Sequence, residues 1–349
     1  MTFKVGIVGC GEIFSAHHVG WSKQRDCEVH AVFDTDPAMT KRVAKHYGVR
    51  RACGTLGELI DTCDVVDICT PPDSHTEIAL AALDKRRHLL IEKPVVPTVA
   101  EWERLAERGR EVGAKICGGF NQKFYPQFQL ARRWVEEGRI GPVLRVRCEQ
   151  MLTPETDWML GQSGHWSHTM SGQRWAETLP HDAYLIYSFV GPVEVVDVAA
   201  LYGTGRAPDA QADEVEVTLR GARCLASVHY SANCERRTRN VVITGSRGTI
   251  EVSGITTVTT FTSVNPARWM DEIGVPFLEA GQKLVQLVPD RARWWTSRFQ
   301  RKAPHTRLID ACNRYFRGVG PSPTDHDEIA NGVRCCEVAA AKLEAARAR

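Results

Sequence analysis

The segment KVGIVGCGEIFSAHH, residues 4–18, places two glycines at the end of an apolar, β-prone run and directly before a run with helical spacing. Gly9 and Gly11 fill the first two positions of a G-x-G-x-x-G pattern, and Phe14 stands at the third. A glycine turn of this kind lets the main chain approach a ligand closely and presents the N–H groups of a helix N-terminus, which favour a pyrophosphate. The pattern therefore predicts a dinucleotide site that includes Gly9, Gly11, Glu12 and Ile13.

Phe14 departs from the pattern at the position that serves packing of the helix on the strand, not contact with phosphate. We therefore expect a slightly displaced helix and intact nucleotide binding. The next predicted strand ends at Asp34, near where a carboxylate binds the ribose hydroxyls. That carboxylate would repel a 2′-phosphate, and residues 35–37 supply no arginine to offset it, so NAD is favoured over NADP. Lys41 and Arg42 keep NADP as an alternative, because a helix could place one of them near the 2′-phosphate.

Composition excludes several other classes of protein. The 349 residues are 43% hydrophobic and 25% charged, as in an ordinary two-domain globular chain. A net charge of +2 without a basic stripe argues against nucleic acid as a partner. No apolar run approaches the roughly 18–20 residues that cross a bilayer. The chain enters a strand at once, without a signal peptide, and its 12 cysteines lack a C-x-x-C pair. Reduced thiols and a cytoplasmic location are expected.

The hydrophobic pattern divides the chain into two parts. Up to residue 121, strands that are apolar on both faces alternate with amphipathic helices, which predicts an α/β domain with a doubly wound parallel sheet. The expected strands are 4–8, 28–33, 65–69, 88–91 and 115–118, and the expected helices are 12–24, 37–46, 56–62, 74–85 and 98–112.

Residues 122–349 predict an α+β domain whose strands are antiparallel, with a cleft between the two domains. The expected strands are 143–151, 193–201, 214–220, 224–230, 240–244 and 249–252, and the expected helices are 126–137, 176–190, 303–317 and 325–347.

Further motifs follow the next strands, and together they resemble one family. CTPPDSH (69–75) and IEKP (91–94) join the glycine loop and Asp34, and GFNQKFYPQF (119–128), AETLPHDAYLIYSFVG (176–191) and ITGSRGTIEV (243–252) continue the likeness. In this order they resemble the Gfo/Idh/MocA family, named for glucose–fructose oxidoreductase, inositol dehydrogenase and rhizopine catabolism. Only 153–175 and 260–302 have no clear counterpart.

The resemblance implies a Rossmann domain followed by a domain with an open, mainly antiparallel sheet. It implies homodimers or homotetramers that associate through those sheets. It also implies NAD(P)-dependent transfer of a hydride to or from a carbinol of a sugar, a cyclitol or a related carbohydrate-like substrate.

Hydride transfer needs positive charge near the substrate oxygen and an acceptor for the hydroxyl proton. Lys93 follows an apolar strand and suits the first role, and the resemblance carries a catalytic lysine onto this position. His181 suits the second, since an imidazole titrates near neutrality, with a pKa of ~6.5. Glu177 lies four residues earlier, on the same helical face, where the family has aspartate. It is expected to orient His181 or to bind a substrate hydroxyl.

Other residues are assigned to the cofactor or the substrate by their place in these motifs. Asn121 and Lys123 stand where the family has N-x-R-F, and they are expected to contact the substrate or the nicotinamide side, with Lys123 as a point charge in place of arginine. A second group is expected beside the nicotinamide ribose: Thr70, Pro71, Pro72, His75, Glu92 and Lys93.

Two segments keep open interpretations. GHWSHTMSGQRW (164–175) offers His165 and Trp166 for a sugar face and its hydroxyls, or forms a packed loop. No metal is predicted, because hydride transfer does not require one and the ligand spacing is poor. RARWWTSRFQRK (291–302) is either a phosphate-binding or subunit-contact segment or a solvated helix face.

Two other functions remain alternatives to a dehydrogenase. An NAD-dependent glycoside hydrolase would need the same lysine but would release no net NADH. A non-catalytic regulator that binds nucleotide and ligand need not keep Lys93 and His181 together, so their joint presence argues against it.

Overall fold

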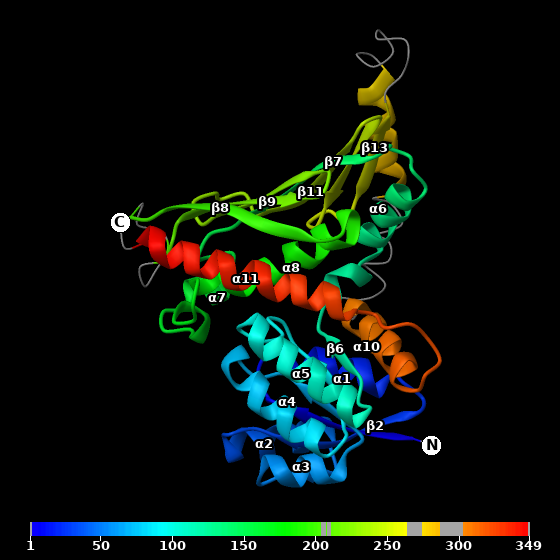
Figure 1. Cartoon of the computed structure of the whole chain (residues 1–349), viewed down its shortest axis with the longest axis vertical. Coiled ribbons are helices and arrows are strands. Elements are labelled where there is room, and N and C mark those ends of the chain that lie inside the picture. Colours follow the sequence, from blue (N-terminus) through cyan, green and yellow to red (C-terminus); the bar gives the residue numbers. More distant parts are fainter. Residues whose placement is uncertain (1, 204–206, 208–210, 264–273, 287–302, 348–349) are drawn as a thin grey trace. The chain divides into compact units, whose positions relative to one another are not determined.

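The computed structural model describes residues 2–203, 207, 211–263, 274–286 and 303–347 (Figure 1). The chain packs as two compact units. One comprises residues 1–124 and 301–333, and the other comprises 125–300 and 334–349. The division at the C-terminal end falls inside helix α11 (His326–Arg347). The boundary expected between residues 121 and 122 stays a prediction.

The first unit holds a six-stranded sheet in the order β3-β2-β1-β4-β5-β6, and every strand pair is parallel. This is the doubly wound order, and it confirms the predicted fold class. Residues 51 and 52 form a short edge strand that the sequence pattern does not indicate. The strands are β1 (Phe3–Val8), β2 (Cys27–Phe33), β3 (Arg51–Ala52), β4 (Val65–Ile68), β5 (His88–Ile91) and β6 (Ile116–Gly118).

Helices cover both faces of this sheet. Side chains of α1, α2 and α10 share one buried cluster with β1 and β2, whereas Gly6 of β1 turns its other face towards Leu59 of α3. α4 packs beside α3 and α5. Helix α10 therefore helps to cover the first sheet, although about 180 residues of the other unit precede it in the sequence. The helices are α1 (Phe14–Ser22), α2 (Pro37–Tyr47), α3 (Leu56–Thr62), α4 (His75–Asp84), α5 (Val99–Val112) and α10 (Ala303–Phe316), with 3-10 turns η1 (Pro72–Ser74) and η2 (Asn121–Phe124).

Local sequence signals set the ends of these helices. The Asp36 carboxylate accepts the Ala38 N–H at the start of α2, and Gly48 ends α2 in the left-handed conformation. Thr98 and Glu101 form a reciprocal capping box at the start of α5, and Gly113 ends it. Such caps satisfy N–H and C=O groups that have no partner inside the helix, so the predicted boundaries were close to the observed ones.

The second unit holds a seven-stranded sheet in the order β13-β12-β11-β7-β10-β9-β8. β7 and β10 are parallel, and all other neighbours are antiparallel, so the predicted mainly antiparallel sheet is confirmed. The last strand, β13, was not expected. The strands are β7 (Val143–Met151), β8 (Val193–Leu201), β9 (Glu214–Gly221), β10 (Leu225–Ser231), β11 (Thr238–Gly245), β12 (Gly248–Ser253) and β13 (Thr259–Ser263).

Helix α8 (Gln173–Val190) packs against β7, β8 and β10, and α6 (Pro126–Glu136) packs against β12 and β13. The rings of Trp175 and Tyr230 stack with centroids 5.1 Å apart, which fixes α8 on the sheet. α8 begins three residues earlier than expected. The remaining elements of this unit are α7 (Trp158–Gly161), the 3-10 turn η3 (Trp166–His168) and a helix at residues 274–286. Within the described ranges, no helix is both long and apolar enough to span a membrane.

Candidate active site

The glycine loop lies where β1 gives way to α1. Gly9 has φ +95°, and a Cβ there would meet the Cys69 carbonyl oxygen at 2.7 Å, so only glycine fits without moving main chain. A Cβ on Gly11 would meet nothing within 4 Å, so this side of the loop faces open space. Glu12 is exposed, and Ile13 is half-buried at the N-cap of α1. An N-terminus next to an open glycine fits the pyrophosphate of a dinucleotide.

Phe14 is buried in the core of the first unit. It is 1% exposed, and its ring lies 5.2 Å from that of Tyr47, centroid to centroid. The bulky ring at the third pattern position is thus accommodated between α1 and α2, and it leaves Gly9 and Gly11 in place.

Asp34 ties the end of β2 to the glycine loop. Its Oδ2 accepts the Cys10 N–H at 2.8 Å, and its Oδ1 accepts the Asp36 N–H at 2.9 Å. Each carboxylate oxygen has a second lone pair, so both can still accept ribose hydroxyls. Asp34 therefore fits the role that the sequence predicts.

The ends of five neighbouring strands, in the order β2-β1-β4-β5-β6, are linked in series by four hydrogen bonds at one edge of the sheet. Hydrogen bonds run from Gly9 N to Phe33 O (2.9 Å), from Cys69 N to Val8 O (2.8 Å), from Glu92 N to Ile68 O (2.9 Å) and from Gly119 N to Ile91 O (2.7 Å). Ligands of open α/β sheets bind at this carboxyl edge. The structure thus gathers the predicted residues around Gly9, Asp34, Thr70 and Lys93 at one edge.

Glu92 and Lys93 follow β5 directly. Glu92 is 6% exposed, and its Oε2 accepts the Lys93 N–H at 3.0 Å. Lys93 is half-buried, and the peptide bond between Lys93 and Pro94 is cis. The main chain at Lys93 is therefore held by the carboxylate of the residue before it.

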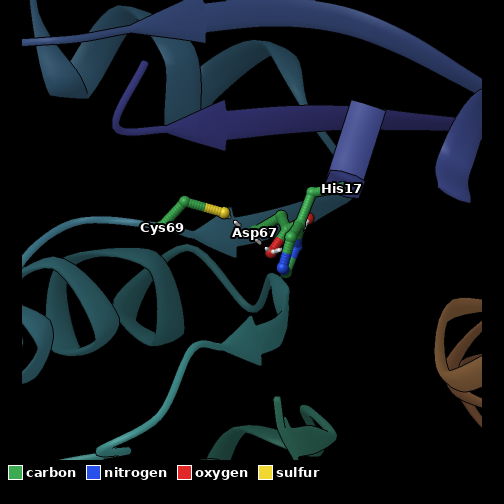
Figure 2. Close-up of side chains that lie close together, drawn as sticks. All are labelled: His17, Asp67 and Cys69. Atoms are coloured by element: carbon green, nitrogen blue, oxygen red, sulfur yellow. Dashed lines mark hydrogen bonds and ion pairs between the residues drawn. The ribbon is translucent and has the colours of Figure 1, made fainter. Parts of the chain in front are cut away.

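A buried imidazole between two carboxylates lies behind this loop. Nδ1 of His17 lies 2.8 Å from Asp67 Oδ2, and Nε2 lies 2.9 Å from Glu92 Oε1 (Figure 2 shows His17 with Asp67 and Cys69). His17 and Asp67 are 0% exposed. Asp67 and its hydrogen bond raise the pKa of His17 well above its usual value, against the opposing effect of burial. Sequence reasoning missed this network, although an aspartate inside the apolar strand VVDI is a signal for a buried partner.

His75 joins the predicted ribose loop to the segment after Lys93. Its Nε2 lies 2.8 Å from the Thr70 carbonyl oxygen, and its Nδ1 lies 3.0 Å from that of Pro94. The ring is fully buried, and burial lowers the pKa of His75. His75 thus holds the loop, with Pro71 exposed and Pro72 buried at the start of η1.

Asn121 and Lys123 lie on η2 and contact the later part of the same unit. Asn121 Nδ2 donates to His305 Nε2 at 2.9 Å. Lys123 Nζ lies 2.6 Å from Glu328 Oε1, in an ion pair whose side chains are 12% and 3% exposed. The structure therefore gives Lys123 a buried carboxylate partner, which sequence reasoning did not foresee because Glu328 lies 205 positions away.

Two groups of potential metal donors occur among the described residues, and both include His17. They are His17 with Asp67 and Cys69, and His17 with Glu92 and His305. Both ring nitrogens of His17 already face carboxylate oxygens. We therefore interpret these groups as an ion-pair network, and the expectation that no metal is needed stays a prediction.

In the second unit, His181 lies on α8, half-buried. Its Nδ1 lies 2.7 Å from the hydroxyl oxygen of Tyr184, a fully buried residue one turn later. The next residue, Asp182, points into the unit, where it accepts the Tyr230 O–H at 2.8 Å and the Arg239 guanidinium at 3.1 Å. These contacts anchor the turn of α8 that carries His181.

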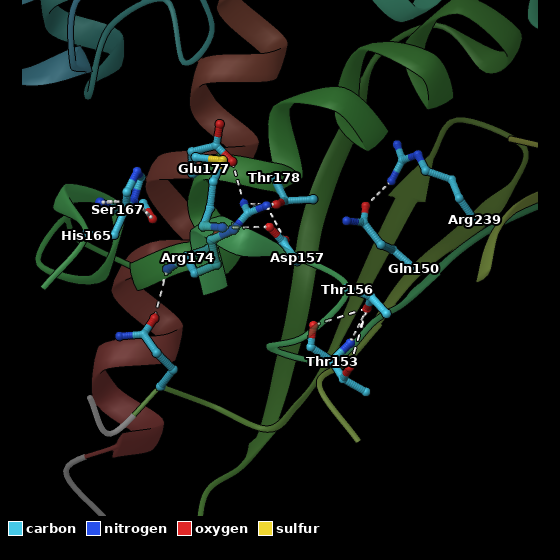
Figure 3. A network of polar contacts seen from close by, with 12 residues as sticks. Gln150, Thr153, Thr156, Asp157, His165, Ser167, Arg174, Glu177, Thr178 and Arg239 are labelled. Carbon is cyan, nitrogen blue, oxygen red and sulfur yellow. Dashed lines mark hydrogen bonds and ion pairs between the residues drawn. The ribbon is translucent and has the colours of Figure 1, made fainter. Parts of the chain in front are cut away.

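Glu177 forms an ion pair with Arg174, one turn earlier on α8. Arg174 donates to Glu177 and Thr178 and, at 2.7 Å, to Asp157 (Figure 3). Arg174 and Glu177 are 5% and 4% exposed. Because Arg174 lies in a segment with no clear counterpart in the family motifs, its ion pair was not anticipated.

The aromatic segment before α8 forms a packed turn beside exposed tryptophan rings. His165 is 8% exposed, and its Nδ1 lies 2.8 Å from Ser167 Oγ (Figure 3). Its ring contacts Trp158 and Trp166, with centroids 5.1 and 5.2 Å away. Trp158 and Trp166 are 48% and 36% exposed. The cationic segment 291–302 lies outside the described residues.

Comparisons with known proteins agree with this geometry. Residues 3–120 match the model of an oxidoreductase family with an NAD-binding Rossmann fold, and residues 128–251 match the C-terminal domain of the same family. An inositol 2-dehydrogenase from Rhizobium meliloti is 26% identical over 259 residues, which are 72% of this chain and 75% of the relative. A glucose-6-phosphate 3-dehydrogenase from Bacillus subtilis is 26% identical over 41% of each chain.

Among solved structures, the WlbA dehydrogenase from Bordetella pertussis, in complex with NADH and UDP-GlcNAcA, has the same fold. It superposes with a TM-score of 0.77 at 20% identity, over 99% of this chain and 96% of that one. The two family models together cover more than half of the sequence. The chain therefore belongs to the Gfo/Idh/MocA family of NAD-dependent oxidoreductases.

Proposed function

We propose that the protein is an NAD-dependent dehydrogenase that moves a hydride between a secondary alcohol of a sugar or cyclitol and the nicotinamide ring. Lys93 stabilises the developing oxyanion, and His181 accepts or returns the hydroxyl proton. Glu177 supports this site through its ion pair with Arg174, one turn earlier on α8. NAD supplies the hydride acceptor when it is bound.

The observation that carries the proposal is the series of linked loops at the carboxyl edge of the parallel sheet. Gly9, Asp34 and Lys93 follow three strands of that sheet, and main-chain hydrogen bonds connect their loops. An ammonium group on such an edge, beside a loop that fits a dinucleotide, suits a reaction in which negative charge develops on a substrate oxygen. The half-buried state of Lys93 strengthens that interaction, because screening by water is weaker there.

The substrate class is proposed from the relatives and from the aromatic turn before α8. The named relatives act on inositol and on glucose 6-phosphate. Trp158 and Trp166 expose parts of their rings, and a ring face of this kind packs against the C–H face of a sugar. His165 and Trp166 thus keep their proposed substrate roles, with Asn121 and Lys123 proposed near the nicotinamide side.

The experiment is an NADH-release assay on a panel of myo-inositol, glucose 6-phosphate and UDP-N-acetylglucosamine, with NAD+ or NADP+. Lys93→Met and His181→Asn should each reduce turnover at least ~10²-fold and leave the Kd for NAD+ within about threefold, as general acid–base loss predicts. The matched controls are Lys85→Met and His229→Asn, which change side chains that are 57% and 37% exposed. Full turnover in either site variant would contradict its assigned role. Glycoside cleavage without net NADH would identify the hydrolase alternative.

We also propose a homodimer or homotetramer that forms through the face of the seven-stranded sheet. One edge of that sheet is already covered by the helix at residues 274–286. Gln286 accepts the Thr259 N–H at 2.8 Å and donates to the Thr259 carbonyl oxygen at 2.6 Å. Gln282 makes the same two hydrogen bonds with Phe261. The strands also expose apolar side chains, including Leu201 at 63% and Leu225 at 50%. Light scattering after size exclusion tests this, and Leu225→Asp should shift the mass towards the monomer.

The cysteines support a reducing, cytoplasmic location for the protein. All twelve are free thiols, and ten of them are buried. Buried thiols such as Cys69, whose pKa burial raises, are unreactive structural side chains. Titration of the native protein with a thiol reagent should therefore label at most the two half-buried residues, Cys27 and Cys234, quickly.

A further inference from the structure

We propose that His17 is a positioning residue. It holds Glu92 in place and, through Glu92, fixes the position of the Lys93 main chain relative to the glycine loop. The inference rests on the proposed role of Lys93, and it adds a buried residue that acts on Lys93 through Glu92. His17 is the fourth residue of α1, the helix that begins at that loop. It therefore links the predicted pyrophosphate site to the predicted catalytic lysine.

The two oxygens of Glu92 have different partners. Oε1 accepts from His17 Nε2 at 2.9 Å, and Oε2 accepts from the Lys93 N–H at 3.0 Å. Gly119 closes the other side, because a Cβ there would lie 2.7 Å from Glu92 Oε1. The carboxylate thus has one position available, and His17 and the Lys93 main chain are joined across it.

The far nitrogen of His17 is fixed in the same way. Nδ1 lies 2.8 Å from Asp67 Oδ2, and that oxygen also accepts the Trp21 N–H at 2.7 Å. Hydrogen bonds at both ring nitrogens prevent the imidazole from turning. Asp67 lies on β4, the strand between the glycine loop and Lys93, so three elements are tied together: α1, β4 and the end of β5.

A gain in stability is by itself a weak explanation for the presence of this buried charged network. Buried ion pairs contribute little more than well-packed apolar residues of the same volume, because desolvation offsets their attraction. Removing one partner, in contrast, leaves a charge buried without compensation. We therefore explain the series Asp67–His17–Glu92 by its effect on the loop at Lys93. It holds that loop in one arrangement, which an apolar cluster would not impose.

The charge state of Glu92 depends on His17. The hydrogen bond and charge of His17 lower the pKa of Glu92 to about 2, although burial alone would raise it. Without His17, burial would therefore raise the pKa of Glu92, and a protonated carboxyl group is a weaker acceptor for the Lys93 N–H. The titratable and charged groups that face His17 and Glu92 are Asp67, Cys69, Lys93 and His305.

The test compares His17→Gln with Trp21→Phe in the full-length protein. Both variants remove a hydrogen bond to Asp67 from α1, but only His17→Gln removes the partner of Glu92. The first readout needs no substrate: the 1H–15N amide signal of Lys93, assigned by its loss in Lys93→Arg. In wild type and Trp21→Phe it should not titrate between pH 5 and 8, whereas in His17→Gln it should.

Turnover and NAD+ binding give the second readout. His17→Gln should lower kcat at least tenfold at pH 6 and recover part of it at pH 9, with the Kd for NAD+ within threefold of wild type. Trp21→Phe should keep kcat within twofold. The proposal is overturned if the Lys93 amide and the pH profile of His17→Gln match those of Trp21→Phe.

Two controls keep this outcome distinct from others. If His17→Gln does not fold, Glu92→Asp replaces it: the shorter side chain cannot reach both partners, so kcat should fall at least tenfold, and an unchanged kcat overturns the proposal. If Lys93→Met keeps full turnover, the proposed function fails instead. Loss of turnover in Lys93→Met, together with an unchanged His17→Gln, rejects only the positioning role.

Discussion

The hydroxyl oxygen of Tyr184 lies 2.7 Å from Nδ1 of His181, one turn apart on helix α8. This contact holds the imidazole of His181 in one orientation on α8. Tyr184 is fully buried, so this contact also satisfies a hydroxyl that has no access to water.

Tyr184→Phe should therefore reduce kcat by about fivefold, which corresponds to the loss of a hydrogen bond of about 1 kcal/mol. Tyr202→Phe is the matched control, because it removes a hydroxyl that bonds the Leu343 carbonyl elsewhere in the same unit. Equal effects of the two substitutions would show that Tyr184 acts through packing only.

Glu177 is expected to contribute mainly to stability, because it neutralises the buried guanidinium of Arg174. Glu177→Ala should lower the free energy of unfolding by about 3 kcal/mol, since one partner of a buried pair is lost. Urea titration measures this. Arg174→Met combined with Glu177→Ala should destabilise less than the sum of the single substitutions. Additive effects would instead mean that the two side chains are energetically independent.

The cofactor preference is expected to depend on the charge of Asp34. Asp34→Asn keeps an oxygen that can accept the Cys10 N–H and removes the negative charge that opposes a 2′-phosphate. The Kd for NADP+ relative to NAD+ should fall roughly tenfold, the effect of removing a repulsion of about 1.4 kcal/mol between partly exposed charges. Fluorescence titration with each cofactor measures the ratio. An unchanged ratio would assign the discrimination to other residues, with Lys41 and Arg42 the first to examine.

The elements of the first unit were largely predictable, because continuous apolar runs and glycine or threonine caps report local structure. The position of α10 was not, because its packing on the first sheet depends on Gly20, which lets Ile309 approach α1 closely. Such a contact between residues 289 positions apart leaves no periodic trace in the sequence. β3 and β13 were missed for a related reason: both lie at sheet edges, where a single neighbour sets the pairing.

The candidate site shows the same limit. Gly9, Asp34 and Lys93 were predicted because each follows a recognisable strand. His17, Arg174 and Glu328 were missed because their importance lies in a charged partner brought close by the fold. A lone charged residue in an apolar segment, such as Asp67, is the signal that points to such pairs.

The stability contributed by the His17 network should have a pH optimum. The pKa of His17 is raised above 6.5, so its contribution is complete below pH 6.5 and is lost as the pH rises through the raised value. The pKa of Glu92 is lowered from 4.5 to about 2, so its contribution is complete above pH 4.5 and is lost as the pH falls towards 2. The unfolding free energy of wild type should therefore exceed that of His17→Gln most between pH 4.5 and 6.5. Urea unfolding from pH 4 to 9.5 measures this gap, and a gap that widens with rising pH would contradict the charge assignment.

The two glycines of the loop should respond in opposite ways to the same substitution. Gly9→Ala forces a Cβ to within 2.7 Å of the Cys69 carbonyl oxygen at φ +95°, so the loop must shift and the protein should lose stability, by about 1–3 kcal/mol, as well as NAD+ affinity. Gly11→Ala adds a Cβ that meets no protein atom within 4 Å, so Tm should stay within about a degree of wild type. Its Kd for NAD+ should nevertheless rise at least tenfold, because the methyl group enters the space that the pyrophosphate requires. Thermal unfolding and NAD+ titration separate the two effects, and a Gly11→Ala protein that binds NAD+ normally would place the pyrophosphate away from this loop.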